Sequence, residues 1–340
     1  MLASVIIVNF NGRQFLDHCL DAVLNQQLAE PFEVLLVDNG STDDSLALTR
    51  AGYPSVRVIE AGRNLGFAGG NNLGIRAARG RHIVLLNNDT RVRPGWLRAL
   101  VDAAEANPTA GAIGAKLLFL DPPDTIQNAG SLLLSDGSGA DRGFREPDRG
   151  QYDKPEEVFG ACGASVLYRR EMLEDVGSFD ETFFMYYEDT DLNWRMRLRG
   201  WKVMYEPAAV VDHVHAGSSR EWSPFFIFCV DRNRLFMLLK NASARTVVRS
   251  YGAFARLAAD NMRLVVRGRM GERRPGSRTV PHQTGRKDAS RARIHMHVAA
   301  SLAAHLPEML VKRSQIRRRR TVPDAAIERW FYPREQWLAR

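Results

Sequence analysis

Three carboxylates lie within four positions at Glu188, Asp189 and Asp191, at the start of a predicted amphipathic helix over residues 188–199. Acids this close repel one another and lose solvation if they are buried, so one or more of them is a candidate for accepting a proton or facing a cation. The same residues suit a helix N-terminus, where the helix dipole and capping favour acids, and Asp191 can pair with Arg195. On its own, the run leaves a catalytic and a structural interpretation equally open.

Asp38 is a second candidate, because it ends the apolar run Val34–Val37, which is typical of a buried strand. At such a strand end a carboxylate can accept hydrogen bonds from the base or ribose of a nucleotide. The structural alternative is an N-cap for the next helix, and Ser41 or Asp43 fits that role better. We therefore interpret Asp38 as a ligand-binding acid.

Asp89 follows another apolar strand, over residues 82–86, that ends in two amides. Mg²⁺ or Mn²⁺ bridging a diphosphate takes only one or two protein carboxylates, because phosphate oxygens and water complete its coordination. His213 also follows a strand and is a candidate metal ligand. The structural alternatives are a turn residue before Pro94 for Asp89 and a hydrogen-bonded structural histidine for His213.

A glycine-rich segment over residues 62–72 lies between a predicted strand and a predicted helix. Backbone N–H groups at such a junction can face an anion. The glycine spacing matches neither the dinucleotide-binding fingerprint nor the P-loop. This weakens the case for a dehydrogenase or an NTPase and leaves the segment as a candidate anion-binding loop.

The first 120 residues alternate short β-branched runs with helical patterns, which predicts a mainly parallel, Rossmann-like sheet covered by helices on both faces. Ligands of such sheets bind at the carboxyl edge of the strands. The segments after the predicted strands are small, polar and acidic. We expect strands over 4–9, 33–37, 56–60 and 82–86, and helices over 14–25, 44–50, 68–79 and 95–106.

Residues 121–158 are rich in Gly, Asp, Pro and Arg and are predicted to form a long excursion or loop. Regular structure is expected again beyond residue 158, and the pattern becomes helical beyond Trp222. A basic, mobile link is predicted at about 267–294. The later expected elements are a helix over 169–176, a strand pair over 202–205 and 208–211, and helices over 225–240, 246–266 and 298–311.

Charge divides the 340-residue chain into two parts. Residues 1–222 carry 22 basic and 31 acidic side chains, whereas residues 223–340 carry 25 and 8. This predicts an acidic domain over 1–222 followed by a basic, mostly helical C-terminal region over 223–340. The three cysteines are far apart in the sequence, which argues against a disulfide framework or a zinc cluster and favours a reducing compartment.

The N-terminus runs directly into a predicted strand without a charged segment, so we expect no signal peptide. No apolar run approaches the roughly 18–20 residues of a membrane-spanning helix. The basic region favours docking on anionic lipid, which predicts a cytoplasmic protein at the inner face of the cell membrane. A polybasic segment can also bind nucleic acid, but no recognised motif supports this and the acidic domain disfavours it. Oligomerisation through these helices is a third possible use.

Six motifs, in order and at family spacing, resemble family 2 glycosyltransferases of GT-A fold, near the bacterial rhamnosyltransferase-like members. The resemblance covers roughly residues 2–222. It implies an inverting transfer from a nucleotide-diphosphate sugar, such as dTDP-rhamnose or a UDP-sugar, to a hydroxyl. The motifs are Asn9–Gly12, Val37–Asp43, Asn64–Asn72, Leu86–Thr90, Gly160–Ala164, and Gly177–Glu181 with Glu188–Asp189.

The resemblance also implies roles for individual residues. Asp38 is expected to contact the nucleotide base, Asp89 to bind the metal ion, and His213 to contact the metal ion or the diphosphate. Asp189 is expected to be the general base, while Glu188 orients a loop or an acceptor hydroxyl. The other residues expected to bind the nucleotide sugar are Asn9, Asn39, Arg63, Asn64, Gly66, Asn71 and Asn88.

One position departs from the family pattern, because Asn87 stands where the first acid of Asp-X-Asp is expected. Metal binding therefore rests on fewer protein charges. The implied function is a Mg²⁺- or Mn²⁺-dependent glycosyltransferase that acts on a glycan or lipid-linked acceptor in bacterial cell-surface polysaccharide synthesis. Two other classes stay open: a sugar-nucleotide nucleotidyltransferase, which needs no base at Asp189, and a non-catalytic carbohydrate- or membrane-binding protein.

Overall fold

The computed structural model describes residues 1–214, 222–266 and 291–338. Within these residues, no helix is long and apolar enough to cross a membrane. The predicted link at about 267–294 lies outside the described residues, except for its last few positions. These positions, residues 291–294, lie at the beginning of a helix and not in a loop.

The described residues divide into two compact units. The first contains residues 1–132 and 141–214. The second contains residues 133–140 together with everything described beyond residue 221. The short segment 133–140 therefore belongs with the C-terminal helices, although the sequence places it within the domain over 1–222.

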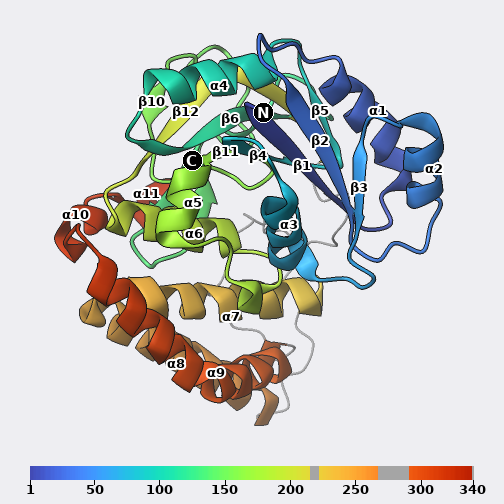
Figure 1. Cartoon of the computed structure of the whole chain (residues 1–340). Coiled ribbons are helices and arrows are strands. Elements are labelled where there is room, and N and C mark those ends of the chain that lie inside the picture. Colours follow the sequence, from blue (N-terminus) through green and yellow to red (C-terminus); the bar gives the residue numbers. More distant parts are fainter. Residues whose placement is uncertain (215–221, 267–290, 339–340) are drawn as a thin grey trace. The chain divides into compact units, whose positions relative to one another are not determined.

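Ten strands form one sheet in the described part of the first unit (Figure 1). They lie in the order β10-β12-β6-β11-β4-β1-β2-β3, with β5 beside β12 and β7 beside β6. Strands β1 to β4 run parallel, whereas β11 runs antiparallel to both of its neighbours. The strands are β1 (Ala3–Asn9), β2 (Phe32–Asp38), β3 (Arg57–Glu60), β4 (His82–Asn87), β5 (Thr90–Val92), β6 (Ala110–Phe119), β7 (Ile126–Asn128), β10 (Glu156–Glu157), β11 (Ser165–Arg169) and β12 (Lys202–His213).

Helices cover both faces of this sheet, as the alternating pattern predicts. Side chains along a strand point to opposite faces in turn, so Val5 and Ile7 of β1 join one apolar cluster and Ile6 joins the other. Helices α1, α2 and α4 pack on the first face, and α3, α5 and α6 on the second. Their bounds are α1 (Arg13–Leu24), α2 (Ser45–Gly52), α3 (Gly66–Ala77), α4 (Trp96–Ala106), α5 (Arg170–Val176) and α6 (Glu188–Leu198).

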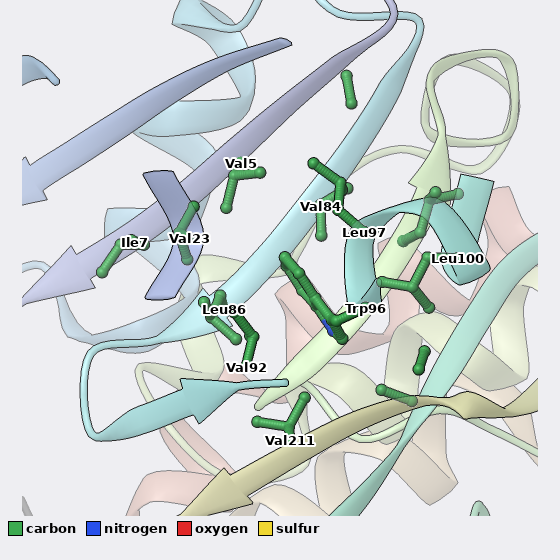
Figure 2. Packing of buried hydrophobic residues seen from close by; sticks show 14 of the residues in the cluster. Val5, Ile7, Val23, Val84, Leu86, Val92, Trp96, Leu97, Leu100 and Val211 are labelled. Carbon is green, nitrogen blue, oxygen red and sulfur yellow. The ribbon is translucent and has the colours of Figure 1, made fainter. Parts of the chain in front are cut away.

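Trp96 of α4 is the largest side chain of the first cluster (Figure 2). It is fully buried against side chains of the sheet, and its indole N–H donates to Ser165 Oγ at 3.0 Å. Buried indoles need such a partner, because an unpaired N–H away from water is costly. This contact fixes α4 over the start of β11, which lies at the edge of the sheet that carries the predicted site.

Three predictions about the elements are wrong. Residues 121–158 are not one loop, because β7 and β10 lie within them. The expected strand pair over 202–205 and 208–211 is one long strand, β12, with an irregularity between Glu206 and Val210. Helix α6 is not amphipathic: nine of its eleven residues are buried, because its polar side chains bond to buried loops.

The second unit is mostly helical, as predicted. Ser223 caps its first helix by accepting a hydrogen bond from Phe226 N, and the three long helices share an apolar cluster that contains Leu235, Phe254 and Val298. A small sheet joins β8, β9 and β13. The elements are α7 (Pro224–Asn241), α8 (Ala244–Val266), α9 (Ala292–Arg319), α10 (Asp324–Glu328), α11 (Arg334–Leu338), β8 (Ser131–Leu134), β9 (Gly139–Asp141) and β13 (Phe331–Tyr332).

Part of the polybasic run near residue 315 has a structural role within this unit. Arg313 donates to the carbonyls of Leu239 and Ala242, and Arg317 also donates to the Ala242 carbonyl. These groups lie at the end of α7, where carbonyls lack partners within the helix. The two arginines therefore hold the end of α7 in place and are directed inward.

Candidate active site

The topology brings the ends of five chain segments to one edge of the sheet. Asn9 and Asp38 are the last residues of the neighbouring parallel strands β1 and β2, and Asn87 ends β4 on the other side of β1. β11 runs antiparallel to β4, so Gly163, two residues before it, lies at the same edge. β12 ends there too, at His213, because it runs parallel to β6, and β6 and β4 are both antiparallel to β11.

A network of amides joins the segments that follow β1, β2 and β4. Asn88 Nδ2 donates to Asn9 Oδ1 at 2.7 Å, and Asn9 Nδ2 donates to Ser41 Oγ at 3.2 Å. Gly12 is needed here, because a Cβ at that position would lie 2.1 Å from Asn88 Nδ2 and 2.5 Å from Asn9 Oδ1. The structure thus brings Asn9 and Asn88 together at this edge of the sheet through a direct hydrogen bond.

Asp38 is buried, and only one of its carboxylate oxygens has a partner within the described residues. Its Oδ2 accepts a hydrogen bond from Ser41 N at 3.3 Å, whereas its Oδ1 is buried without a hydrogen bond. Leaving a buried acceptor unsatisfied costs about 1–3 kcal/mol. This oxygen is therefore suited to accept a hydrogen bond from a ligand.

The glycine-rich loop is held in place by Asn39. Asn39 Oδ1 accepts from Leu65 N, while its Nδ2 donates to Asn64 Oδ1 and to the Gly66 carbonyl. Gly66 adopts a φ of +73°, and a Cβ there would lie 2.4 Å from the Phe184 carbonyl oxygen. Asn39, Asn64 and Gly66 are thus brought together, with Asn39 positioning the loop.

The other two residues predicted for this loop are not joined to that group. Arg63 is exposed, and Asn71 is buried and donates to the Phe67 carbonyl one turn earlier in α3. Asn72, which the sequence analysis missed, has a clearer structural role. Its side chain donates to the Phe179 carbonyl and to Glu181, and accepts from Phe179 N. Asn72 therefore attaches the segment that contains Phe179 and Glu181 to α3. Its place in a motif rich in Asn and Gly was the only available signal.

Asp89 and His213 face each other across 124 positions of sequence. His213 Nε2 lies 3.0 Å from Asp89 Oδ1, and His213 Nδ1 lies 2.8 Å from Gln127 Oε1. All three side chains are buried. When Nδ1–H donates to Gln127, a neutral ring directs the lone pair of Nε2 towards the carboxylate.

This pair fits a divalent cation. Two adjacent ligands, each about 2.1 Å from an octahedral ion, lie about 3.0 Å apart, which is the separation of Asp89 Oδ1 and His213 Nε2. No cluster of three or more His, Cys, Asp or Glu side chains suited to a metal ion occurs among the residues placed in the structure. Asp89 and His213 would hold the ion, with phosphate oxygens and water in the remaining positions. Gln127 orients the imidazole and was not predicted.

The carboxylates of α6 have three different surroundings. Asp189 Oδ2 accepts from Gly163 N at 3.0 Å, and its Oδ1 accepts from the Thr190 backbone N and side-chain hydroxyl. Burial raises the pKa of Asp189 above its ordinary value, although these hydrogen bonds oppose the shift. Burial, followed by the neighbouring Asp189 charge, raises the pKa of Glu188 well above its ordinary value, and Glu188 Oε2 has no hydrogen bond within the described residues.

The backbone before α6 is unusual. Phe184, Tyr186 and Tyr187 all have positive φ angles, of 64°, 69° and 69°. Such conformations are costly for bulky residues, at about 1–3 kcal/mol each, and they cluster at functional sites. They turn the chain sharply, so that α6 begins at Glu188 and Asp189 beside the Gly163 turn.

Asp191 has a structural role, as predicted. It is fully buried, and its Oδ2 accepts from Arg195 Nε at 2.8 Å. Arg195 also donates to the carbonyls of Val176, Gly177 and Ser178. Trp194 is buried edge-on against Phe159, which is a packing role.

We expect Asp191→Asn to lower the free energy of unfolding by about 3 kcal/mol, because Arg195 then keeps a buried charge without its counter-charge. Urea denaturation followed by circular dichroism measures the loss. Asp102→Asn is the matched control, since Asp102 forms the same i,i+4 pair with Arg98 on an exposed surface, at 3.8 Å. We expect its effect to stay below about 0.5 kcal/mol. Equal losses in the two variants would contradict the structural role of Asp191.

Residues 4–177 match the family model described as glycosyl transferase family 2. The chain belongs to this family. The N-acetylglucosaminyl-diphospho-decaprenol L-rhamnosyltransferase of Mycobacterium tuberculosis is 32% identical to this glycosyltransferase over an alignment of 240 positions, and the match covers 63% of this chain and 76% of that protein. Family membership favours a glycosyltransferase over the non-catalytic and nucleotidyltransferase alternatives.

Solved structures show that the fold is GT-A. GalNAc-T7 with UDP, GalNAc and Mn²⁺ superposes with a TM-score of 0.61 at 16% identity, covering 74% of this chain and 50% of that chain. The mannosyltransferase PcManGT from Pyrobaculum calidifontis, in complex with GDP-Man and Mn²⁺, has a TM-score of 0.52 at 16% identity, covering 89% of this chain and 86% of that chain. The glycosyltransferase thus combines a GT-A fold with a helical C-terminal extension.

Proposed function

We propose that this glycosyltransferase transfers a sugar, with inversion, from a nucleotide-diphosphate sugar to a hydroxyl of a glycan or lipid-linked acceptor in bacterial cell-surface polysaccharide synthesis. One observation carries the proposal: the Asp89–His213 pair and the Asp189 carboxylate lie at the same edge of the sheet. The proposed metal site and the proposed base therefore lie at one ligand-binding edge, which supports the proposal. Similarity to an L-rhamnosyltransferase favours dTDP-rhamnose over a UDP-sugar as donor.

The donor is held through its nucleotide and its diphosphate. The unpartnered Oδ1 of Asp38 accepts a hydrogen bond from the base or the ribose. Asp89 and His213 would hold Mg²⁺ or Mn²⁺, which would supply positive charge for the leaving diphosphate. Solved structures of the same fold contain Mn²⁺ together with UDP or GDP-Man, which supports the use of a divalent cation and a nucleotide donor.

Asp189 acts on the acceptor. Its carboxylate removes the proton of the acceptor hydroxyl while that oxygen bonds to the anomeric carbon, and the bond from this carbon to the diphosphate breaks. Hydrogen bonds from Gly163 and Thr190 fix the carboxylate without protonating it. Burial and the neighbouring Asp189 charge raise the pKa of Glu188 well above its usual range, which favours the neutral form of Glu188. A neutral neighbour lets Asp189 carry the single negative charge of the pair.

A panel of UDP-, GDP- and dTDP-sugars, with and without Mn²⁺ or Mg²⁺, tests the function directly. We expect metal-dependent hydrolysis or transfer from one donor class, and inversion at the anomeric carbon as read by NMR of the product. Retention of configuration would reject the proposed mechanism. Turnover that is unaffected by chelation would reject the metal site.

The pH dependence of the reaction follows from Asp189. Because its pKa is raised, the carboxylate is ionised only above this raised value, and the base is lost as pH falls through it. We expect kcat/KM to fall on the acidic side with a midpoint above the ordinary Asp pKa of about 4. The pH profile of kcat/KM with a saturating metal concentration measures this midpoint. A flat profile down to the ordinary value would contradict the assignment.

The basic C-terminal region is proposed to hold the enzyme at the anionic inner face of the cell membrane, close to a lipid-linked acceptor. Within the second unit, nine described arginines are exposed against three glutamates. The arginines are Arg245, Arg249, Arg256, Arg263, Arg293, Arg318, Arg319, Arg320 and Arg329, and the glutamates are Glu308, Glu328 and Glu335. This excess of positive charge supports the membrane location.

A further inference from the structure

Helix α9 has two unlike sides. One side carries buried residues such as His295, Val298 and Met309, and α9 and α7 lie against each other. An exposed side carries Met296, Leu306, Leu310 and Val311, which are 51%, 43%, 48% and 58% exposed. Ala300 and Ala303 lie between them on the same side and are also exposed. We call these six residues the α9 strip.

The spacing of the α9 strip places its residues on one side of the helix over about four turns. Positions 296, 300, 303, 306 and 310 recur every three or four residues, which is the period of one helix face. At about 1.5 Å per residue, the strip extends over about 22 Å. An apolar strip of this length on a surface helix is typical of a protein or membrane contact.

Exposed arginines of the second unit indicate which kind of surface the α9 strip contacts. Arg293 and Arg318 are exposed just beyond the two ends of the strip. On α8, Arg245, Arg249 and Arg256 are exposed at spacings of four and seven residues, which places them on one side of that helix. An apolar strip flanked by arginines is the pattern of a helix that lies in the interface of an anionic bilayer.

We propose that the α9 strip inserts into the headgroup region of an anionic membrane, while the exposed arginines of α8 and α9 contact lipid phosphates. A second copy of the chain fits less well, because a two-fold contact across the strip would bring Arg293 and Arg318 near like charges. Arg313 and Arg317 take no part, since they hold the end of α7. The inference rests on the proposed function only in taking the acceptor to be membrane-borne.

Co-sedimentation of the full chain with vesicles tests the strip without any sugar donor. We expect binding to phosphatidylcholine vesicles that contain phosphatidylglycerol, and much weaker binding to phosphatidylcholine alone. Leu310→Glu should weaken the binding by about tenfold or more, since it removes a Leu from the apolar contact and adds a repelled charge. Arg318→Gln should weaken it by about fivefold.

Leu120→Glu is the matched control, because Leu120 in the first unit is 48% exposed, as is Leu310. This variant should bind vesicles like the unaltered chain. Equal losses for Leu120→Glu and Leu310→Glu would overturn the proposal. So would light scattering that shows Leu310→Glu dissociating a dimer while vesicle binding stays unchanged. Because no transfer is measured, failure of the proposed catalytic function would leave this result standing.

Discussion

Asp189→Asn is expected to lower sugar transfer by about 10²–10⁴-fold, which is the usual contribution of a general base. The amide has nearly the same shape as the carboxylate but cannot take a proton from the acceptor hydroxyl. Its oxygen can still accept from Gly163 N or Thr190 N. The substitution therefore removes the base while the start of α6 keeps its position.

Donor binding should change little in this variant, because Asp38, Asp89 and His213 are untouched. Isothermal titration with the nucleoside diphosphate and Mn²⁺ measures this, and single-turnover transfer measures the chemical step. We also expect the free energy of unfolding to fall by about 1–3 kcal/mol, because the new amide nitrogen faces a backbone N–H group from which the carboxylate accepted a hydrogen bond. Asp191→Asn should lose stability through its buried ion pair instead, although it lies only two residues away.

Appreciable turnover by Asp189→Asn would show that another group is the base. Glu188 is the nearest alternative, so Glu188→Gln is measured beside it. Burial raises the pKa of Glu188 and favours its neutral form, and Gln is neutral as well. We therefore expect Glu188→Gln to retain much more activity than Asp189→Asn. If the two effects were reversed, the roles of the two acids would be exchanged.

The sheet and the place of the site are predictable from sequence because both depend on local patterns. Alternating strands and helices over the first 120 residues dictate a mainly parallel sheet, and parallel strands end at one edge. Asp38 and Asp89 were found because each follows an apolar strand. Their position at the edge then follows from chain direction alone, without knowledge of packing.

Contacts between distant segments were not predictable. Gln127 lies in a segment that reads as loop, yet it bonds to His213 across 86 positions. Residues 133–134 pair with Phe331 and Tyr332 near the other end of the chain, and two-residue strands leave no periodic signal. In such cases each segment adopts its structure through its contact with the other segment. The sequence of either segment alone therefore does not predict that structure.

Helix α6 was misread for a related reason. Its Arg and Asp residues suggest a solvent-facing side, because charged residues are seldom buried unless they are paired. Arg195 and Arg197 are nevertheless buried, since loop carbonyls at residues 158–159 and 176–178 accept their hydrogen bonds. The helix is thus a buried anchor that holds Asp189 beside the Gly163 turn, rather than a surface element.

Asp89→Asn is expected to lower kcat/KM by about 10²–10³-fold at a fixed, moderate Mn²⁺ concentration, because it removes the negative charge that holds the cation at the leaving diphosphate. The loss should be large because Asn87 stands where the family pattern supplies another acid. Among the described residues, the predicted site thus depends on one carboxylate and one imidazole.

Titration of activity with Mn²⁺ separates metal binding from folding. Asp89→Asn should require a much higher Mn²⁺ concentration for half-maximal activity and should recover in part when Mn²⁺ is raised. Asp212→Asn is the matched control, since Asp212 is adjacent to His213 on β12 but pairs with Arg93 near the surface. It should titrate like the unaltered enzyme.

His213→Gln should have a smaller effect than Asp89→Asn and should act in the same direction. The side chain loses its nitrogen ligand, but no formal charge is removed when the ring is neutral. If His213 only supported Asp89 through a hydrogen bond, Gln could replace it and the Mn²⁺ requirement would not move. A shifted Mn²⁺ requirement in His213→Gln therefore identifies a metal ligand, whereas an unchanged requirement identifies a hydrogen-bonding support for Asp89.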